Sequence, residues 1–251
     1  LIVPINKKRI VIVGATSAIA EQCARIWIKA DAAELILISR DAKKTEALAM
    51  DLRVRSPQSE VDVITIDFFD SVAIANLADK LCAQRCPDIV LIAHGSLPDQ
   101  AQCQQDLVAV SEALEINGIS PALFAEGFAA HMARHNAGTL ALIGSVAGDR
   151  GRKSNYVYGA AKGLITRYAQ GLQHRFAGTN VKVVLIKPGP TATPMTAHLP
   201  RRGLASSAAV ASLIVKGIDQ GKAVVYAPGK WAVIMMIIRH LPAFVFNKLD
   251  I

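Results

Sequence analysis

A hydroxyl, a phenol and an ammonium stand close together in the middle of this chain. Tyr158 and Lys162 are four residues apart, and the alanines at 160 and 161 favour a helix around them, so both side chains are expected on one helix face. Ser145 follows the apolar run 139–143, which predicts a buried strand. A cation beside a phenol favours the phenolate and lowers the pKa of the phenol. The three residues are therefore candidates for proton transfer near neutral pH.

Ser145, the Tyr158-x-x-x-Lys162 motif and the upstream Asn117 together resemble the catalytic set of the short-chain dehydrogenase/reductase family. The Tyr-x-x-x-Lys spacing alone also suits a half-buried tyrosine capped by a surface lysine. The serine thirteen residues before the tyrosine and a nucleotide-binding start near residue 14 favour the family. The resemblance implies an α/β fold, a doubly wound Rossmann-type parallel sheet of about seven strands with helices on both faces. We expect one such domain over residues 1–251.

In the family, such a set reduces a carbonyl group or oxidises a secondary alcohol with a nicotinamide dinucleotide. The resemblance implies that Ser145 and Tyr158 donate hydrogen bonds to the substrate oxygen and that Tyr158 gives it a proton. It implies that Lys162 stabilises the phenolate and holds the nicotinamide ribose. Asn117 is expected to hold a water that passes protons to Lys162.

The first strand, residues 9–13, runs into a turn that begins at Gly14 and opens a helix. Such a turn directs backbone N–H groups and a helix N-terminus at phosphate. Gly14 matches the first glycine of the family pattern, whereas alanines at 18 and 20 replace the second and third. Thr16 and Ser17 are expected to offer hydroxyls to phosphate, with at least one of them also capping the helix. Ile19 is expected to lie against the same cofactor.

The second strand, residues 34–38, ends at Ser39 and Arg40. A fold that binds NAD usually carries an acid at this point to accept from the ribose 2′-OH, whereas an arginine forms paired contacts with a 2′-phosphate. NADP(H) is therefore favoured. In the alternative, Arg40 is an exposed loop residue and NAD(H) is bound through backbone and hydroxyl contacts.

The family resemblance also implies cofactor contacts after the third and fourth strands, at 61–66 and 88–93. Asp67, followed by Phe68, is expected to accept from the adenine amine, or else only to cap the next helix. Ala93, His94 and Gly95 stand where the family shows Asn-Asn-Ala-Gly, and only the glycine matches. His94 is expected either to contact ribose or to fill space.

A loop after the sixth strand, residues 181–186, is expected to close the nicotinamide pocket. Its cofactor-binding residues by resemblance are Pro188, Gly189, Thr191 and Thr193. Ile186 and Thr191 are expected at the amide end and Thr193 at phosphate. Residues 190–205 would form a substrate lid. One long helix is expected over 104–134, with a break near Asn117, a helix from Tyr158 to about residue 176, another over 206–221 and a final strand over 223–226.

The tail, residues 230–251, is hydrophobic. Its apolar run 231–238 is too short to span a bilayer. We expect it to bury against another subunit, to line the substrate pocket, or to lie in a membrane interface with Arg239 and Lys248 at the headgroups. A homodimer or homotetramer is expected because the family often forms symmetric oligomers.

The composition restricts the partners. The net charge is +8, but aromatic residues are only 5% of the chain and no groove-reading element is recognisable, so nucleic acid is not expected. Anionic cofactor phosphates or an anionic membrane surface suit the charge better. The four cysteines and two neighbouring histidines have no metal-site spacing, so no metal is expected. Reduced cysteines and the lack of a signal-peptide pattern predict a cytoplasmic protein, with a peripheral position on the inner face of the membrane as an alternative.

A narrower resemblance involves residues 14–17, 92–95, 157–159, 194–199 and 235–242. These stretches are similar to the decaprenylphosphoryl-2-keto-ribose reductase group. That similarity implies reduction of a polyprenyl-phosphate-linked keto-sugar, which a hydrophobic lid and tail would suit. The alternatives are a dehydrogenase of another small or lipidic ketone or alcohol, and a non-catalytic NADP(H)-binding regulator that kept the fold.

Overall fold

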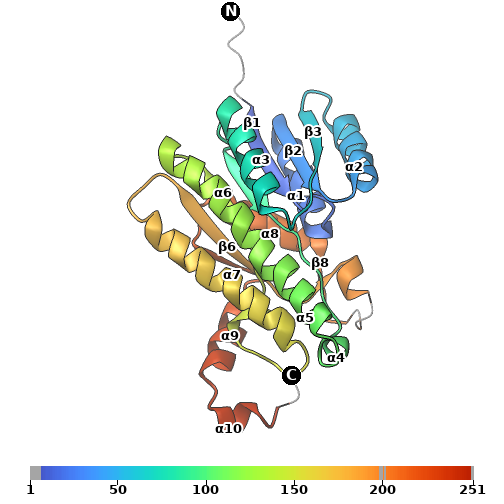
Figure 1. Cartoon of the computed structure of the whole chain (residues 1–251), viewed down its shortest axis with the longest axis vertical. Helices are drawn as coiled ribbons and strands as arrows, with labels where there is room; N and C mark the ends of the chain where they lie inside the picture. Colours follow the sequence, from blue (N-terminus) through green and yellow to red (C-terminus); the bar gives the residue numbers. More distant parts are fainter. Residues whose placement is uncertain (1–6, 198–199, 201, 250–251) are drawn as a thin grey trace, which may run out of the picture.

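A parallel β-sheet carries the candidate site (Figure 1). The structure is a computed structural model, and it describes residues 7–197, 200 and 202–249. Within these residues the main sheet has seven strands in the order β3-β2-β1-β4-β5-β6-β9. Their bounds are β1 Lys8–Val13, β2 Ala33–Ser39, β3 Glu60–Thr65, β4 Ile89–Ile92, β5 Thr139–Ile143, β6 Lys182–Pro188 and β9 Val224–Ala227. Every neighbouring pair is parallel, as the sequence predicted.

Helices cover both faces of this sheet, which is why its strands are almost continuously apolar. Ile10, Ile12, Leu35 and Leu37 face the helices α1 Ala18–Ala30, α2 Ala42–Arg55 and α8 Ser207–Asp219. The alternate residues, such as Val11 and Ile36, face α3 Ser71–Gln84, α6 Ser120–His135 and α7 Tyr156–Arg175. The two hydrophobic cores thus lie on opposite faces of one sheet, whose apolar strands contribute side chains to both.

The chain changes direction across the sheet between β1 and β4. β2 and β3 extend the sheet on one side of β1, and β4 returns to pair with its other side. At this switch point Gly14 has a φ of +79°, and a Cβ there would lie only 2.6 Å from the backbone nitrogen of His94. Ligands bind outside the carboxyl ends of strands at such a point. The close approach therefore fixes both walls of a crevice.

The segment before α6 differs from the single helix expected over 104–134. It contains α4 Gln100–Cys103, α5 Leu107–Leu114 and a π-helical turn Glu115–Ile119 that leads into α6. Asp106 caps α5 by accepting from the Val108 N–H, so the helix begins at Leu107. The break expected near Asn117 is the π turn. The helical run Leu107–His135 is long and apolar enough to span a bilayer by length and composition alone, but its α6 part packs Phe124 and Phe128 into the core.

The tail forms two helices, α9 Lys230–His240 and α10 Ala243–Phe246. Arg150 anchors them, because its guanidinium donates to the Ile238 and Leu241 carbonyls at 2.6 Å each and stacks 3.8 Å from the Phe246 ring centroid. At the start of α9, Trp231 packs on Gly189, where a Cβ would lie 1.9 Å from the indole Nε1. The tail therefore lies against the loops at the carboxyl ends of β5 and β6.

A buried ion pair holds the turn between β5 and α7. This turn is the 3₁₀ helix Val146–Asp149, and the Asp149 carboxylate pairs with Lys187 at the end of β6. The Tyr226 hydroxyl of β9 donates to the same carboxylate at 2.9 Å. Breaking such a buried pair on one side is strongly unfavourable. The turn that follows Ser145 is thus tied to two strands of the sheet.

Short elements complete the described chain. A two-stranded ladder joins β7 Thr191–Ala192 to β8 Ala205–Ser206, and a 3₁₀ turn Pro194–Thr196 follows β7. The expected lid, 190–205, lies partly outside the described residues, because 198, 199 and 201 are not among them. The ladder brings the two ends of that segment together.

Candidate active site

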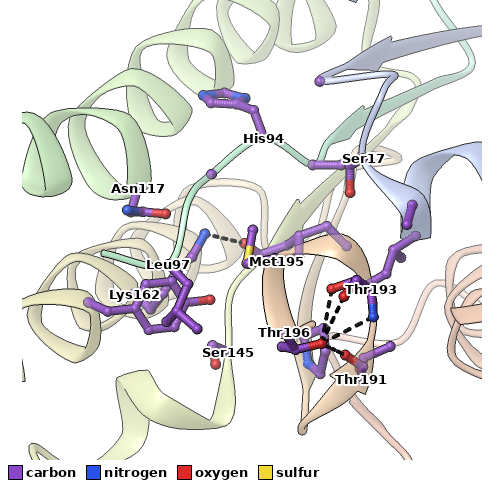
Figure 2. A pocket seen from close by; sticks show the side chains of 18 of the residues that line it. Ser17, His94, Leu97, Asn117, Ser145, Lys162, Thr191, Thr193, Met195 and Thr196 are labelled. Atoms are coloured by element: carbon purple, nitrogen blue, oxygen red, sulfur yellow. Dashed lines mark hydrogen bonds between the residues drawn. The ribbon is translucent and has the colours of Figure 1, made fainter. Parts of the chain in front are cut away.

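A cavity of about 740 Å³ opens at the carboxyl ends of the strands, at the switch point (Figure 2). Its volume is within the range of small-molecule and cofactor sites. The segments after β1, β2, β4, β5 and β6 all contribute to its lining. Ser145, Tyr158 and Lys162 line this cavity, and so does Arg40, which precedes α2. One cavity therefore contains both the residues suited to proton transfer and an arginine suited to binding phosphate.

Lys162 is a buried cation on the floor of the cavity. Its side chain is 3% exposed, and its Nζ donates to the Ile143 carbonyl at 3.1 Å (Figure 2). Burial lowers the pKa of Lys162 from 10.5 to about 8. The Nζ lies 5.8 Å from the centroid of the Tyr158 ring, because the two residues are one turn apart on α7. The ammonium is therefore held where a developing negative charge on the phenol would be stabilised.

Tyr158 and Ser145 are linked through their hydroxyls. A hydrogen bond between the two side chains lowers the pKa of Tyr158, but burial has the larger effect and raises it. The expectation of a lowered pKa is therefore not met, because desolvation of the phenolate outweighs the hydrogen bond from Ser145. Ser145 also accepts from the Ala147 N–H at 3.1 Å, which orients its hydroxyl. Tyr158 is thus a protonated phenol at neutral pH.

Asn117 is fully buried in the π turn, beside Lys162. Its Oδ1 accepts from the Ser96 N–H at 2.9 Å, and its Nδ2 donates to the Ala113 carbonyl at 2.9 Å. Gly95 lies directly against this amide, since a Cβ there would be 2.6 Å from Oδ1. The side chain braces the loop after β4, and it supplies a contact that the altered Asn-Asn-Ala-Gly segment lacks. Its role in a water relay stays a prediction.

The turn after β1 forms the opposite wall, and Gly14, Thr16, Ser17 and Ile19 all line the cavity. Ser17 occupies the N-cap position of α1, yet its side chain makes no capping hydrogen bond. Among the described residues its hydroxyl therefore remains available to a ligand (Figure 2), whereas a capping role had been expected for Thr16 or Ser17. Ala18 also lines the cavity and Ala20 is fully buried, so the two alanines keep the turn compact without the family's glycines.

Arg40 and Ser39, at the end of β2, differ in their availability. Arg40 is exposed at the cavity wall, with its guanidinium carbon 5.8 Å and 5.6 Å from the Phe68 and Phe69 ring centroids. Ser39 is buried, and its hydroxyl bonds Thr45 and the Asp41 carbonyl, so it lines the cavity without a free hydroxyl. The Asp41 carboxylate caps α2 by accepting from the Lys44 N–H. That bond holds the pKa of Asp41 below its usual value.

Of the neighbouring residues Asp67 and Phe68, only Phe68 lines the cavity. The Asp67 carboxylate accepts from the Phe69 N–H at 3.0 Å and is not part of the cavity lining, while Asp70 caps α3. The structure thus places Asp67 in a local turn outside the cavity lining, and its contact with adenine stays a prediction. Phe68 lines the cavity and packs against the imidazole of His94, with 4.6 Å between the ring centroids.

His94, with Ala93 and Gly95, lines the cavity at the end of β4. The His94 Nε2 lies 2.9 Å from the Ser120 hydroxyl, and its ring points away from Ser145 (Figure 2). Burial first, then the charges of Lys162 and Arg40, hold the pKa of His94 well below its usual value. The ring is therefore a neutral group in an aromatic cluster with Phe68 and Phe124, which favours the space-filling interpretation.

The loop after β6 lines the cavity with Pro188, Gly189, Thr191 and Thr193. The Thr191 hydroxyl donates to the Gly189 carbonyl at 2.8 Å, and Thr193 forms a capping box with Thr196. Ile186, expected at the amide end, is fully buried in the sheet and does not reach the cavity. The hydroxyls of this loop mainly fix its own conformation.

Several lining residues had no motif to mark them. They lie in the loop between β5 and α7 and in the segment after β7, and they include Leu97, Arg152, Asn155, Pro194 and Met195. Arg152 and Asn155 stand between Ser145 and Tyr158 in the sequence, which was the available signal.

Comparison with known proteins now places the chain. The sequence pattern of the short chain dehydrogenase family matches residues 8–202. The chain belongs to the short-chain dehydrogenase/reductase family. An uncharacterized oxidoreductase of Streptomyces coelicolor is 28% identical over 245 residues, which are 96% of each chain. An uncharacterized oxidoreductase of Mycobacterium tuberculosis is 29% identical over 242 residues, again 96% of each.

Solved short-chain dehydrogenase structures share the fold. A bulky-bulky ketone specific alcohol dehydrogenase from Comamonas testosteroni superposes with a TM-score of 0.80 at 22% identity, over 98% of this chain and 96% of that one. A short-chain dehydrogenase from Sphingobium yanoikuyae, in complex with NADPH, gives 0.81 at 20% identity, over 97% and 96%. The family membership makes the protein a nicotinamide-dependent oxidoreductase.

The buried charge of Lys162 has a measurable effect on stability. Its pKa in the folded state, about 8, lies below the usual 10.5, so the folded protein disfavours the proton. Lys162→Met should therefore be more stable than the native protein at pH 7, by up to roughly 3 kcal/mol before the lost Ile143 hydrogen bond is subtracted. The advantage should shrink as the pH rises from 8 towards 10.5, because only the unfolded chain still carries the proton there.

Denaturant unfolding at pH 7 and pH 10 measures this difference. Lys80→Met, at an exposed position of α3, is the matched control and should change little at either pH. A Lys162→Met variant that is destabilised equally at both pH values would contradict a costly buried cation.

Proposed function

We propose that the protein reduces a ketone, with Tyr158 as the proton donor. The observation that carries the proposal is the convergence of the Ser145 hydroxyl, the Tyr158 phenol and the buried Lys162 ammonium on one cavity of cofactor size. A bound nicotinamide would supply the hydride. The chain supplies the groups that bind the carbonyl oxygen, where negative charge grows during reduction.

Each of these side chains has a distinct role. Ser145, oriented by the Ala147 N–H, donates to the carbonyl oxygen. Tyr158 gives its proton to that oxygen, and the Lys162 ammonium stabilises the phenolate that remains. Asn117 holds the loop after β4 in place and connects the site to water. Because burial raises the pKa of Tyr158, the phenol carries the proton that reduction of a ketone needs.

NADP(H) is the cofactor we propose. Arg40 is exposed at the cavity wall, and Lys44 lines the same region, so two cations are near the place of a ribose 2′-phosphate. The acid beside them, Asp41, is occupied as the cap of α2 and is a poor partner for a ribose 2′-OH. The NADPH complex of the Sphingobium yanoikuyae enzyme supports this choice by analogy of fold.

A lipid-linked ketone, such as a polyprenyl-phosphate-linked keto-sugar, is the substrate class that the tail supports. Trp231 of α9 packs on Gly189, which lines the cavity, so the tail starts at the cavity rim. Beyond it, α9 and α10 expose large apolar side chains: Val233 (57%), Met236 (52%), Ile237 (56%) and Phe244 (71%). Arg239 lies between them and Lys248 follows them in the chain, which fits an anionic membrane surface on the cytoplasmic side.

The role of Tyr158 as proton donor can be tested by substitution. Tyr158→Phe removes the proton donor and keeps the ring, so NADPH-dependent reduction should fall about 10²–10⁴-fold. Cofactor binding, followed by fluorescence, should remain within a fewfold of the native value. Tyr156→Phe, at a more exposed position of the same helix, is the control and should keep full activity. Near-normal turnover by Tyr158→Phe would refute the assignment, and a lack of turnover in the native protein with any carbonyl would favour a non-catalytic NADP(H)-binding regulator.

The preference for NADPH over NADH can be tested through Arg40. Native protein should bind NADPH more tightly than NADH, and Arg40→Ala should weaken NADPH binding at least tenfold while leaving NADH nearly unchanged, because only NADPH carries the 2′-phosphate. Fluorescence titration with both nucleotides measures this. Equal losses for the two nucleotides, or an initial preference for NADH, would remove Arg40 from this role.

Binding of the tail to an anionic membrane can be tested with vesicles. Native protein should sediment with vesicles that contain anionic phosphatidylglycerol, and Ile237→Glu with Phe244→Glu should abolish sedimentation without loss of folding. Val54→Glu, at an 81% exposed apolar position of α2, should sediment like the native protein. If the tail variants only turn an oligomer into monomers, as measured by analytical ultracentrifugation, the surface is an interface between copies of the chain.

A further inference from the structure

Arg152 lies in the wall of the cavity, and among the described residues its side chain has no hydrogen-bonding partner. It is half-buried, and no hydrogen bond or ion pair joins its guanidinium to any residue in the described part of the chain. Its Nε is fully buried and unpaired. A guanidinium has five N–H donors, and donors that are buried without acceptors are costly. Burial also lowers the pKa of Arg152, which is consistent with this cost.

The two neighbouring basic residues of the loop are used differently. Arg150 is taken up by the carbonyls at the end of α9 and by the Phe246 ring, and Lys153 also has an interaction. Arg152 lies between them and turns into the cavity instead. Arg150 therefore holds the tail in place, and Arg152 does not contribute to that role.

Asn155 is a second unpaired group beside it. It lines the cavity, and its Oδ1 is buried with no hydrogen-bond donor among the described residues. Asn155 occupies the N-cap position of α7, yet its side chain does not cap the helix. The same helix carries Tyr158 one turn further on, so an acceptor, a guanidinium and the phenol lie along one stretch of the cavity wall.

The position of Arg152 separates it from the cofactor phosphates that Arg40 would bind. Arg152 and Asn155 belong to the loop between Ser145 and Tyr158, the two residues that hold the carbonyl oxygen in the proposed reaction. Arg40 is on the loop after β2 and Arg152 on the loop after β5, with β1 and β4 between these two strands. Among the described residues that line the cavity, Asp41 is the only carboxylate, and it already caps α2.

We propose that Arg152 and Asn155 form a substrate subsite, in which the guanidinium binds an anionic group of the ketone, a phosphate or a carboxylate, and the Asn155 Oδ1 accepts from a substrate hydroxyl. This inference rests on the proposed function and narrows it to hydroxylated ketones that carry an anion. A guanidinium binds such oxyanions through two parallel hydrogen bonds, which fixes orientation as well as affinity. The anion would place the carbonyl carbon before Ser145 and Tyr158.

Two substrates with the same ketone test the subsite: benzoylformate, which is a carboxylate, and its uncharged ethyl ester. Steady-state reduction with NADPH is measured for the native protein, for Arg152→Met and for a control, Arg167→Met. The control removes an exposed arginine of α7, the helix that follows the loop of Arg152. Arg152→Met should raise the KM for benzoylformate by about ten- to hundredfold, the effect of losing a charge-assisted hydrogen bond. The KM for the ester and for NADPH should change less than twofold, and Arg152→Lys should recover part of the preference for the acid.

A second measurement keeps the subsite testable if neither ketone is turned over. Phenyl phosphate is titrated calorimetrically into the NADPH-saturated native protein and the same variants. Binding that is lost in Arg152→Met and retained in Arg167→Met supports the subsite even where the proposed reduction fails. Equal binding or equal kinetics in Arg152→Met and Arg167→Met, or parallel losses for the acid and the ester, would overturn it.

Discussion

The contact between Gly14 and the backbone of His94 is the constraint on which the rest of the structure depends. It lies where the order of the parallel strands reverses, and it leaves no room for a side chain at residue 14. Because β1 and β4 come so close, the loops that follow them diverge and leave a crevice between them. Groups suited to binding phosphate stand on one side of this crevice, and groups suited to proton transfer stand on the other.

Buried charged side chains support the wall of the crevice that carries Ser145. Asp149 and Lys187 fix the turn after Ser145, and Lys162 projects its ammonium onto the Ile143 carbonyl. Burial of an unpaired charge is unfavourable, so Lys162 lowers the stability of the ligand-free protein. Lys162 in particular lacks a carboxylate partner among the described residues, which is typical of a group arranged for function.

Periodicity and spacing predicted the parallel sheet and brought Ser145, Tyr158 and Lys162 to one place, because strand ends and helix faces follow from local sequence. Properties that depend on partners distant in the chain were beyond such patterns. Burial reversed the expected pKa shift of Tyr158, and local turns occupied the side chains of Ser39 and Asp67. Arg150 and Arg152 look alike in the sequence, yet one holds the tail and the other lines the cavity.

The Tyr226 hydrogen bond to Asp149 connects the active-site turn to β9, which is the edge strand of the sheet. Edge strands and the segments beyond them open by local unfolding at a lower free energy than the protein as a whole. Opening of β9 would hydrate the Asp149–Lys187 pair and release the turn that follows Ser145. The position of Ser145 in the candidate site therefore depends on contacts that reach the edge of the sheet as well as on its central strands.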